Sequence, residues 1–445
     1  MILVFWFRLG ILPFPEGFSI YMENCHLRTE KNRMQKTLVV AGGGAAGFFC
    51  AVTAARLNPG LKVILVEKTG KLLSKVKVSG GGRCNLTHAC FSIPEMVGKY
   101  PRGSNFVKKT FHQFFTTDTI RWFEERGVPL KTETDGRMFP LSNSSQTIMD
   151  CLLTEAAKYQ VEIRLHHEVK HIEYKTEPVS FRMHFNNDLI LDADFVCLAS
   201  GGYPKSGLFD WIRQSGHQIE DPIPSLFTFN IPGHPITSLM GISVPDAGVR
   251  LTGESLKERG PLLITHWGLS GPAILKLSAW GARLLNKKNY RFEIRVNWLG
   301  DLRDSTLRED IQAIRESSGG RKIKQKNPWD LPQRLWEWFL DQAGIKDIHW
   351  ADLPSASQNK LIQLLTSQSF HIDGKTTFKE EFVTAGGIRL SEVSHLSLES
   401  RIRPGLFFAG ELLDVDGITG GFNFQHAWTS GYIAGKSIAE ASMRA

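Results

Sequence analysis

The chain has 445 residues, of which 42% are apolar and 22% are charged, and its formal net charge is +8. This length predicts two or three domains with sizeable cores, because single cores rarely grow beyond roughly 250 residues. No apolar run reaches the roughly eighteen residues that a membrane-spanning helix needs. The net charge permits a polyanionic partner without requiring one. The six cysteines form neither a C-x-x-C pair nor a zinc-ligand spacing, which is typical of free thiols in a reducing cytoplasm.

The first 33 residues differ from the rest of the chain. Their apolar run at 2–12 is short, contains Arg8 and ends before Pro13, and it lacks the basic start and small-residue cleavage site of a signal peptide. Met34 directly precedes the first predicted strand. We therefore expect residues 1–33 to be a disordered extension or the product of a start codon placed too far upstream.

A dinucleotide-binding pattern begins at residue 38. The apolar run 38–41 predicts a strand, and the loop 42–47 reads G-x-G-x-x-G. An alanine-rich stretch at 45–57 predicts a helix, after which the second apolar run 63–66 ends at Glu67. A lone glycine triplet would be weak evidence, but the strand, triplet, helix, strand and acid in this register predict a site for an adenine dinucleotide.

Each element of this pattern has a physical role. Gly42 makes the tight turn, Gly44 lets the backbone approach a pyrophosphate, and Gly47 lets the helix pack closely on the strand. The helix N-terminus offers free N–H groups and the positive end of the helix dipole, while Glu67 can accept hydrogen bonds from ribose hydroxyl groups.

A second glycine-rich segment lies at 79–85, where three consecutive glycines are flanked by Ser79, Arg83 and Asn85. Each glycine weakens a helix or strand because it loses much backbone entropy on folding. Such a run makes sense where the backbone must lie against a flat ring or a phosphate.

Here the sequence resembles a known group, the BaiN/RdsA-like FAD flavoproteins, which are described as NAD(P)/FAD-dependent oxidoreductases or as an aminoacetone oxidase family. The resemblance extends from about residue 37 to the C-terminus. The family usually has Thr in place of Ser200 and often Tyr in place of Phe422, and both changes are mild. The motifs that carry it are S-G-G-G-R-C-N at 79–85, V-C-L-A-S-G-G-Y-P-K-S-G at 196–207, T-H-W-G-L-S-G-P at 265–272, V-T-A-G-G at 383–387, G-L-F-F-A-G-E-L-L-D at 405–414 and G-I-T-G-G-F-N-F-Q at 417–425.

The two halves of the predicted cofactor site lie near residues 42 and 420, so the cofactor domain must be discontinuous. Between them, alternating apolar residues at 225–231 and 290–296 predict β-structure, and the spacing of apolar residues at 331–339 predicts helix. The resemblance implies the same α/β class: a Rossmann-type FAD-binding domain with an inserted β-rich, barrel-like domain and a small helical subdomain. The expected boundaries are 1–33 for the extension, 34–210 for the first segment of the FAD-binding domain, 211–300 for the β-rich domain, 301–370 for the helical subdomain and 371–445 for the second segment of the FAD-binding domain.

The C-terminal motifs predict a flavin clamp. The buried-strand pattern 406–409 delivers Glu411 to the carboxyl end of a sheet, where it could hold a ribitol hydroxyl group. A helix predicted at 424–442 would direct its N-terminus at the pyrimidine end of the isoalloxazine ring. An ordinary glycine-rich loop before a C-terminal helix is the alternative. The residues expected to bind FAD are Gly42, Gly44, Ala45, Ala46, Gly47, Glu67, Lys68, Lys75, Ser79, Gly80, Gly81, Arg83, Asn85, Ser200, Gly201, Gly410, Glu411, Asp414, Gly420, Gly421, Phe422 and Asn423.

Two residues are candidates for proton transfer, and no metal is expected. His266 precedes a glycine-rich turn that would leave its imidazole exposed, so it could act as a general acid or hold a substrate carbonyl group; a structural histidine is the alternative. Cys84 could protonate a carbon opposite the hydride, or it could simply pack in the core. Arg83 is expected to contact FAD or an anionic substrate.

The sequence contains one dinucleotide fingerprint, whereas enzymes with separate FAD and NAD(P)H domains normally show two. If NAD(P)H reduces the flavin, it must enter the same cleft transiently. An oxidase would avoid that need.

The substrate is inferred from charge and resemblance. One basic cluster lies at 321–326 beside Trp329, and another includes Lys99, Arg102, Lys108 and Lys109. Lysine and arginine beside aromatic rings suit RNA, although solvated surface is the alternative. The family includes members that reduce a uridine in large-subunit ribosomal RNA and others that reduce a conjugated bond in steroid-like acids.

We therefore expect a cytoplasmic FAD-dependent oxidoreductase that reduces an activated C=C bond. A ribosomal RNA uridine is the leading substrate, so ribosomal RNA or a ribosome precursor is the leading partner. The alternatives are a small-molecule enone reductase or amine oxidase of the same fold, and a flavin-bound sensor or assembly protein without turnover.

Overall fold

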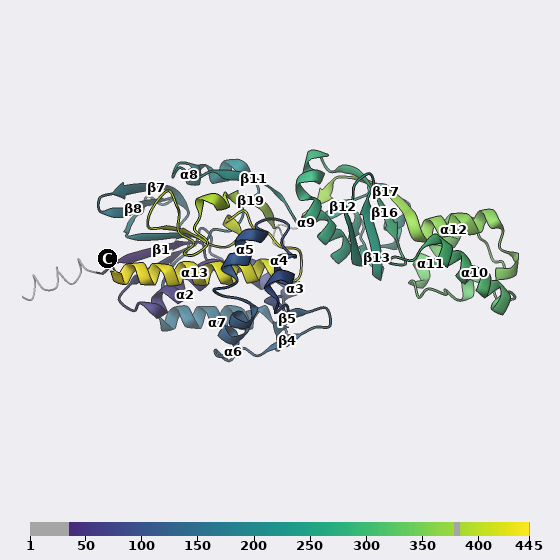
Figure 1. Ribbon diagram of the computed structural model, residues 1–445, viewed down its shortest axis with the longest axis horizontal. Coiled ribbons are helices and arrows are strands. Elements are labelled where there is room, and N and C mark those ends of the chain that lie inside the picture. The colour runs from purple at the N-terminus through teal and green to yellow at the C-terminus, as the bar shows by residue number, and fades with distance from the viewer. Residues whose placement is uncertain (1–34, 378–382, 445) are drawn as a thin grey trace, which may run out of the picture.

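The computed structural model describes residues 35–377 and 383–444. The expectation for residues 1–33 lies outside these ranges. The molecule is elongated, with a helix-and-sheet body at one end, a second sheet in the middle and a group of helices at the far end (Figure 1).

Within the described residues, the body is built on a parallel sheet of five strands. Its order is β20-β10-β1-β2-β6, and every neighbouring pair is parallel. The strands are β1 (Thr37–Ala41), β2 (Lys62–Val66), β6 (Glu162–Arg164), β10 (Phe195–Leu198) and β20 (Leu406–Phe408). Strands β1, β2, β10 and β20 are almost continuously apolar because both faces of the sheet are covered. The pairing of β20 with β10 confirms a discontinuous Rossmann-type domain, since segments about 200 residues apart complete one sheet.

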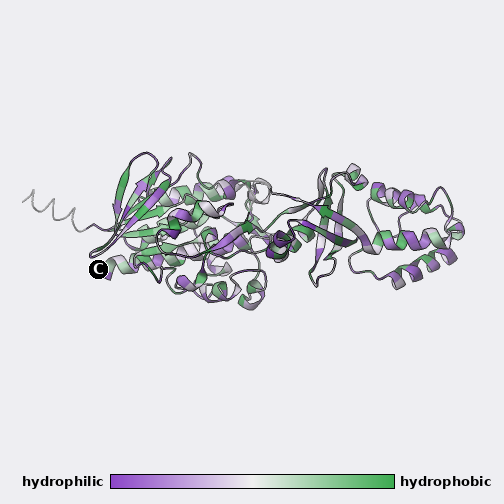
Figure 2. Ribbon diagram, turned by 90° about the horizontal axis from the view of Figure 1, so that it is seen from above, coloured by the Kyte–Doolittle hydropathy of each residue, from purple (hydrophilic) through white to green (hydrophobic). Residues whose placement is uncertain are grey.

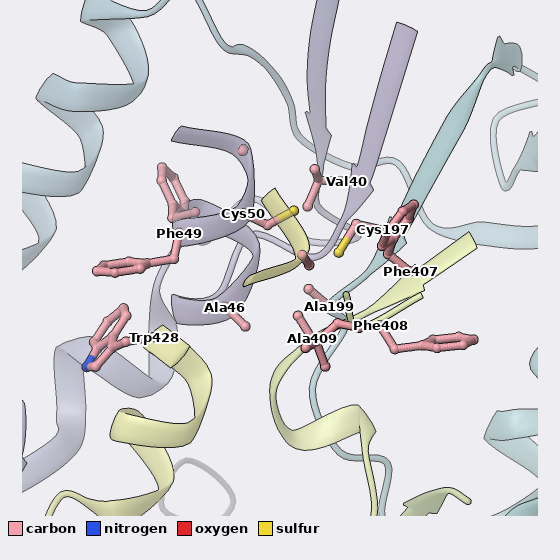
Figure 3. Packing of buried hydrophobic residues seen from close by; sticks show 14 of the residues in the cluster. Val40, Ala46, Phe49, Cys50, Cys197, Ala199, Phe407, Phe408, Ala409 and Trp428 are labelled. Atoms are coloured by element: carbon pink, nitrogen blue, oxygen red, sulfur yellow. The ribbon is translucent and has the colours of Figure 1, made fainter. Parts of the chain in front are cut away.

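Two helices cover one face of this sheet. Helix α2 (Ala45–Leu57) has the expected bounds, and α13 (Phe422–Arg444) begins two residues earlier than expected. The helices lie side by side (Figure 1) because Gly431 and Gly435 lack side chains: a Cβ at either position would lie 2.4 Å from a carbonyl oxygen of α2. Phe49 and Trp428 pack across this contact, with ring centroids 4.8 Å apart (Figure 3).

Short elements complete the body. A three-stranded sheet lies on the other face of the parallel sheet (Figure 1), and it consists of β7 (Val169–Thr176), β8 (Val179–Phe185) and β9 (Ile190–Ala193). The remaining elements are α3 (Ser74–Gly82), β3 (Thr87–His88), α4 (Ile93–Val97), α5 (Ser104–Thr110), α6 (Thr116–Glu124), β4 (Leu130–Thr132), β5 (Arg137–Pro140), α7 (Ser145–Lys158), α8 (Asp210–Arg213), β11 (Ile219–Pro224) and β19 (Thr384–Ile388).

The middle of the molecule is a second sheet, which is antiparallel and has seven strands in the described portion of the chain. Its order is β17-β16-β13-β14-β15-β12-β18, and α9 (Pro272–Lys287) packs on β14 and β13. Its strands are β12 (Thr228–Asn230), β13 (Ser243–Leu251), β14 (Lys257–Ile264), β15 (Gly268–Ser270), β16 (Arg291–Asn297), β17 (Gln368–Asp373) and β18 (Lys375–Thr376).

The far end consists of α10 (Asp304–Ser318), α11 (Gln333–Gln342) and α12 (Ser355–Ser367). Figure 2 shows their mixed apolar and polar faces. Leu307 of α10 and Leu335 of α11 belong to the same hydrophobic cluster as Ile294 of the sheet, so the sheet and these helices share one core. Because β11 instead pairs with β19 of the body and β17 belongs to the second sheet, we place the limits of the inserted unit near residues 225 and 377 rather than at 211 and 370.

Candidate functional site

The glycines of the turn after β1 differ in the space around them. Gly42 has a φ of +124°, and a Cβ there would lie 2.3 Å from the Ala199 carbonyl oxygen. A Cβ at Gly47 would lie 1.9 Å from the Gly42 carbonyl oxygen. At Gly44, by contrast, no heavy atom lies within 4 Å of a Cβ. The turn therefore leaves open space at Gly44, the position at which a dinucleotide-binding turn admits a pyrophosphate.

Packing contacts and hydrogen bonds from neighbouring residues stabilise this turn. Ala45 and Ala46 form the first turn of α2, and the backbone of Ser200, at the end of β10, packs against Gly42. The Glu67 carboxylate accepts hydrogen bonds from the Gly43 N–H (3.0 Å) and from the N–H and hydroxyl groups of Thr69 (both 2.9 Å).

A carboxylate can accept about four hydrogen bonds, so Glu67 keeps capacity for a ribose hydroxyl group. The neighbouring Lys68 is exposed, and its ammonium group lies 5.5 Å from the ring centroid of Tyr203.

The segment 79–85 turns in the left-handed region. Gly80, Gly81 and Gly82 have φ values of +59°, +69° and +84°, and no atom lies within 4 Å of a Cβ at the last two. The backbone of Gly81 and Gly82 is therefore exposed and could lie against a ring. The side chains beside them are occupied: the Ser79 hydroxyl group donates to the Val76 carbonyl oxygen (3.1 Å).

Arg83 and Asn85 also make internal contacts. Arg83 pairs with Glu133 (2.6 Å) and lies 4.1 Å from the ring centroid of Phe139. Its guanidinium group is therefore engaged by the protein itself, whereas the sequence predicts a contact with the cofactor or an anionic substrate. With its amide oriented to suit its neighbours, Asn85 donates to the Thr87 carbonyl oxygen (3.1 Å) and accepts from the Gly421 N–H (3.0 Å).

A clasp joins three distant segments at the end of β20. The Lys75 ammonium group lies 2.5 Å from Glu411 Oε2, and Glu411 Oε1 accepts a hydrogen bond from the Thr384 N–H (2.9 Å). Gly201 faces the same carboxylate, since its Cβ would lie 4.0 Å from Glu411 Oε2. A Cβ at Gly410 would lie 2.8 Å from the Ala46 Cβ, so this glycine allows the clasp to approach α2 closely. The structure thus brings together expected cofactor residues from both ends of the chain.

The loop 417–423 leads into α13 and is tightly bound. Asn423 exchanges two hydrogen bonds of 2.8 Å with the backbone of Gly417. A Cβ at Gly420 would lie 2.7 Å from the ring of Phe422, and one at Gly421 would lie 2.6 Å from the backbone of Thr87. These contacts hold the first turn of α13, and hence the positive end of its dipole, in a fixed place.

Two residues that the sequence did not single out support this loop. The His88 ring stacks on Phe422 with centroids 4.7 Å apart, and its Nδ1 lies 3.0 Å from the Gly420 carbonyl oxygen. The Tyr100 hydroxyl group donates to the Phe422 carbonyl oxygen (2.6 Å). In the sequence, the position of His88 three residues after the S-G-G-G-R-C-N motif was the one indication that it lies near this site.

Helix α9 of the inserted unit meets the body beside this loop. Arg102 forms a buried ion pair with Asp416 and donates to the Ala279 carbonyl oxygen (2.8 Å) and the Ser225 hydroxyl group (3.0 Å). Four residues along α9, Arg283 lies 3.6 Å from Asp414, whose pKa is raised by burial. The cations of this junction are supplied by both the body and the inserted unit.

The two expected proton donors lie in different surroundings. His266 is exposed on the turn between β14 and β15, with its ring centroid 4.4 Å from that of Trp267. Cys84 is completely buried, and burial raises the pKa of its thiol to about 12. Among the residues that the structure describes, no hydrogen bond joins these two, and the Cys84 thiol has no surface from which to meet a substrate.

The fold and the site define an FAD-dependent oxidoreductase built on a discontinuous Rossmann domain. The chain belongs to the family described as HI0933-like protein Rossmann domain, whose model matches residues 36–437. No helix among the residues that the structure describes has the length and apolar character needed to cross a membrane.

Three curated proteins are similar to almost the whole chain. It is 30% identical over 411 residues to a ribosomal RNA dihydrouridine synthase of Haemophilus influenzae, covering 90% of this chain and 98% of that protein. It is 29% identical over 412 residues to a ribosomal RNA dihydrouridine synthase of Escherichia coli, covering 91% and 98%. It is 27% identical over 410 residues to a 3-dehydro-bile acid delta(4,6)-reductase of Clostridium scindens, covering 90% and 98%.

Proposed function

We propose that this protein reduces a uridine of large-subunit ribosomal RNA to dihydrouridine. The observation that carries the proposal is the similarity to two ribosomal RNA dihydrouridine synthases along 98% of their length, which includes the inserted unit as well as the cofactor body. Bound FAD would supply a hydride for the activated C=C bond of the uracil ring, with NAD(P)H as the source of its electrons, and a side chain of the protein would supply the proton that completes the saturated bond.

The chain's own residues hold the cofactor and supply the proton. The open backbone at Gly44 would admit the pyrophosphate, Glu67 would accept a hydrogen bond from the ribose, and the clasp of Lys75 and Glu411 would hold the middle of the cofactor. We assign the acid or carbonyl-binding role to His266 rather than to Cys84, because an exposed imidazole can reach a substrate and exchange a proton, whereas a buried thiol cannot.

The charges available to RNA are fewer than the sequence suggests. In the cluster 321–326, Lys322 pairs with Asp347 at 2.5 Å and Lys324 lies 4.0 Å from Glu337. Arg321 and Lys326 are exposed and form no ion pair within the described ranges. These two residues are the better candidates for phosphate contacts.

In the second cluster, Arg102 is buried in its pair with Asp416, and the rings of Phe106 and Phe111 are buried in the core. Lys108 and Lys109 are exposed. The aromatic rings therefore do not form a stacking platform for bases, and RNA binding at this cluster would depend on the lysines alone.

The decisive experiment is mass spectrometry of ribosomal RNA nucleosides from a deletion strain. We expect loss of dihydrouridine from the large-subunit RNA and its restoration by the wild-type gene. Purified protein with NADPH or NADH should then restore dihydrouridine to RNA from the deletion strain, whereas a Gly44→Val variant should not.

A small-molecule enone reductase is the second candidate, favoured by the equally complete similarity to the bile acid reductase. It predicts unchanged dihydrouridine in the deletion strain together with NAD(P)H-dependent consumption of a conjugated steroid-like enone. That combination of results would contradict the ribosomal proposal.

A further inference from the structure

Two lysines from distant segments of the chain lie at the junction between the cofactor body and the inserted unit. Lys99 follows α4 in the body, and Lys276 lies in α9. Both are only partly exposed, and neither ammonium group forms an ion pair within 4 Å anywhere in the described ranges. Partly buried ammonium groups without a direct counter-ion are uncommon, because desolvation of the charge is costly.

Lys99 is fixed beside the loop that leads into α13. Its carbonyl oxygen accepts a hydrogen bond from the Ile418 N–H (2.9 Å), two residues before Gly420. His88 is bound to the Gly420 carbonyl oxygen through Nδ1, so Lys99 and His88 are anchored to the same short segment. That segment contains residues expected to bind the flavin end of the cofactor.

Lys276 reaches this junction from the other side. Ala279 of α9 accepts a hydrogen bond from Arg102 of the body, and Arg283 of α9 lies beside Asp414. Residues three and seven positions apart share one face of a helix, so Lys276 lies on the face of α9 that contacts the body. Figure 1 shows α9 at the end of the inserted unit that faces the body.

Two titratable groups at this junction lie within electrostatic range of both lysines. The charges of Lys99 and Lys276 both lower the pKa of His88, whose pKa is lowered chiefly by burial, and both oppose the burial that raises the pKa of Glu258 in β14. Asp135 also acts on His88, but its carboxylate is engaged by Arg137 at 2.7 Å. Burial and these two charges favour the neutral form of His88, and neither Glu258 nor Asp135 forms an ion pair with either lysine.

We propose that Lys99 and Lys276 form a phosphate-binding site across the junction, next to the flavin end of the cofactor, with His88 at its base. The ligand class is a phosphate ester of a dissociable substrate. The pyrophosphate of FAD is served by the open turn at Gly44, so this second cationic site takes a different molecule. The phosphate comes from the RNA strand next to the target uridine or from NAD(P)H. The identity of the first source rests on the proposed function, whereas the phosphate chemistry does not.

The test compares the FAD-loaded wild type with Lys99→Gln/Lys276→Gln and a matched control, Lys346→Gln/Lys360→Gln. The control removes two exposed lysines of the inserted unit and gives the same change in net charge. Flavin content and melting temperature should be unchanged in both variants. Lys99→Arg/Lys276→Arg, which keeps both charges, should behave nearly as the wild type.

Binding is measured first with inorganic phosphate, by line broadening of its ³¹P resonance at low ionic strength. Broadening by the wild type and the control but not by Lys99→Gln/Lys276→Gln is expected. Absence of broadening in the wild type, or equal broadening in all three proteins, would overturn the site. This binding measurement needs no RNA, so it tests whether the phosphate site exists even if ribosomal RNA is not the substrate.

Steady-state kinetics then identify the source of the phosphate. A roughly tenfold rise in KM for ribosomal RNA, with kcat and the KM for NADPH little changed, would assign the site to the RNA strand. A rise confined to the KM for NADPH would assign it to the nicotinamide substrate. Unchanged KM values for both substrates would overturn the proposal while leaving dihydrouridine formation, and hence the proposed function, intact.

Discussion

The cofactor body and the inserted unit are held together by different means. In the body, close approaches between backbone segments require glycine: Gly47 lies against the Gly42 carbonyl oxygen, and Gly431 lies against the Ala46 carbonyl oxygen. In the inserted unit, an antiparallel sheet and the helices α9 to α12 bury ordinary apolar side chains such as Leu307 and Leu335 in a common core. The body therefore tolerates few changes at these backbone positions, whereas the inserted unit depends on its pattern of apolar residues.

Gly47→Val should have the largest effect. Its Cβ would lie 1.9 Å from the Gly42 carbonyl oxygen, and backbone at that distance cannot give way as a flexible side chain can. We expect loss of the folded body and aggregation on expression. A soluble variant with a wild-type circular dichroism melting curve would show that the turn is more adaptable than the comparison implies.

Gly44→Val tests the same turn at a glycine that faces open space. We expect a folded protein that is purified without yellow colour and is not reconstituted by added FAD, since the branched side chain fills the space of the pyrophosphate. The absorbance near the flavin maximum, read beside the melting temperature, provides the measurement. A normal flavin spectrum in this variant would refute the assignment of the turn.

His266→Ala tests chemistry in the inserted unit. Flavin binding should be unchanged because His266 lies outside the glycine turns, whereas reoxidation of the reduced enzyme by its substrate should slow by about two to four orders of magnitude. Stopped-flow absorbance of the flavin measures this half-reaction, and Cys84→Ala is the parallel variant. Unchanged rates in both variants would remove both candidate acids.

The stability of the body should depend on pH through His426. Burial lowers the pKa of this histidine to about 4, below its value of about 6.5 in the unfolded chain. Above pH 6.5 both states are neutral and the full stability is present. As the pH falls from 6.5 to 4, the unfolded state takes up a proton that the folded state does not, so the free energy of unfolding should fall by up to about 3 kcal/mol.

Urea unfolding at a series of pH values measures this dependence. In His426→Gln, whose amide can still donate to the Gly410 carbonyl oxygen, the slope should be smaller. Some of the slope should remain, because the pKa of His217 is also lowered to about 4. An identical pH profile in wild type and variant would contradict the assignment to His426.

The smallest effect concerns the exposed cluster of the inserted unit. Changing Arg321, Lys322, Lys324 and Lys326 together to Gln should flatten the salt dependence of RNA binding, since each neutralised phosphate releases counter-ions. Arg321→Gln/Lys326→Gln should account for most of the change, because Lys322 and Lys324 already face carboxylates. Filter binding between low and moderate salt gives the slope. An equal change of slope in Arg321→Gln/Lys326→Gln and in Lys322→Gln/Lys324→Gln would contradict this difference between the free and the paired cations.

The sequence determined the cofactor body in considerable detail. The strand at 38–41, the glycine triplet and the acid at Glu67 are consecutive local signals, and the structure has α2 with the expected bounds. Local patterns suffice here because each glycine is required by a turn or contact near it in sequence or by a strongly recurring fold. The β-rich and helical segments were also visible from the spacing of apolar residues.

Only the tertiary structure decided which charged groups remain available. Arg102, Lys322 and Arg83 resemble Lys99 and Arg321 in the sequence, yet the first three pair with carboxylates up to 314 residues away and the latter two do not. The common core of the second sheet and the helices, and the placement of Lys99 and Lys276 at one junction, likewise depend on packing between distant segments. Periodicity reports the neighbours of a residue along one element, whereas the electrostatic environment of a side chain is set by elements that the fold brings beside it.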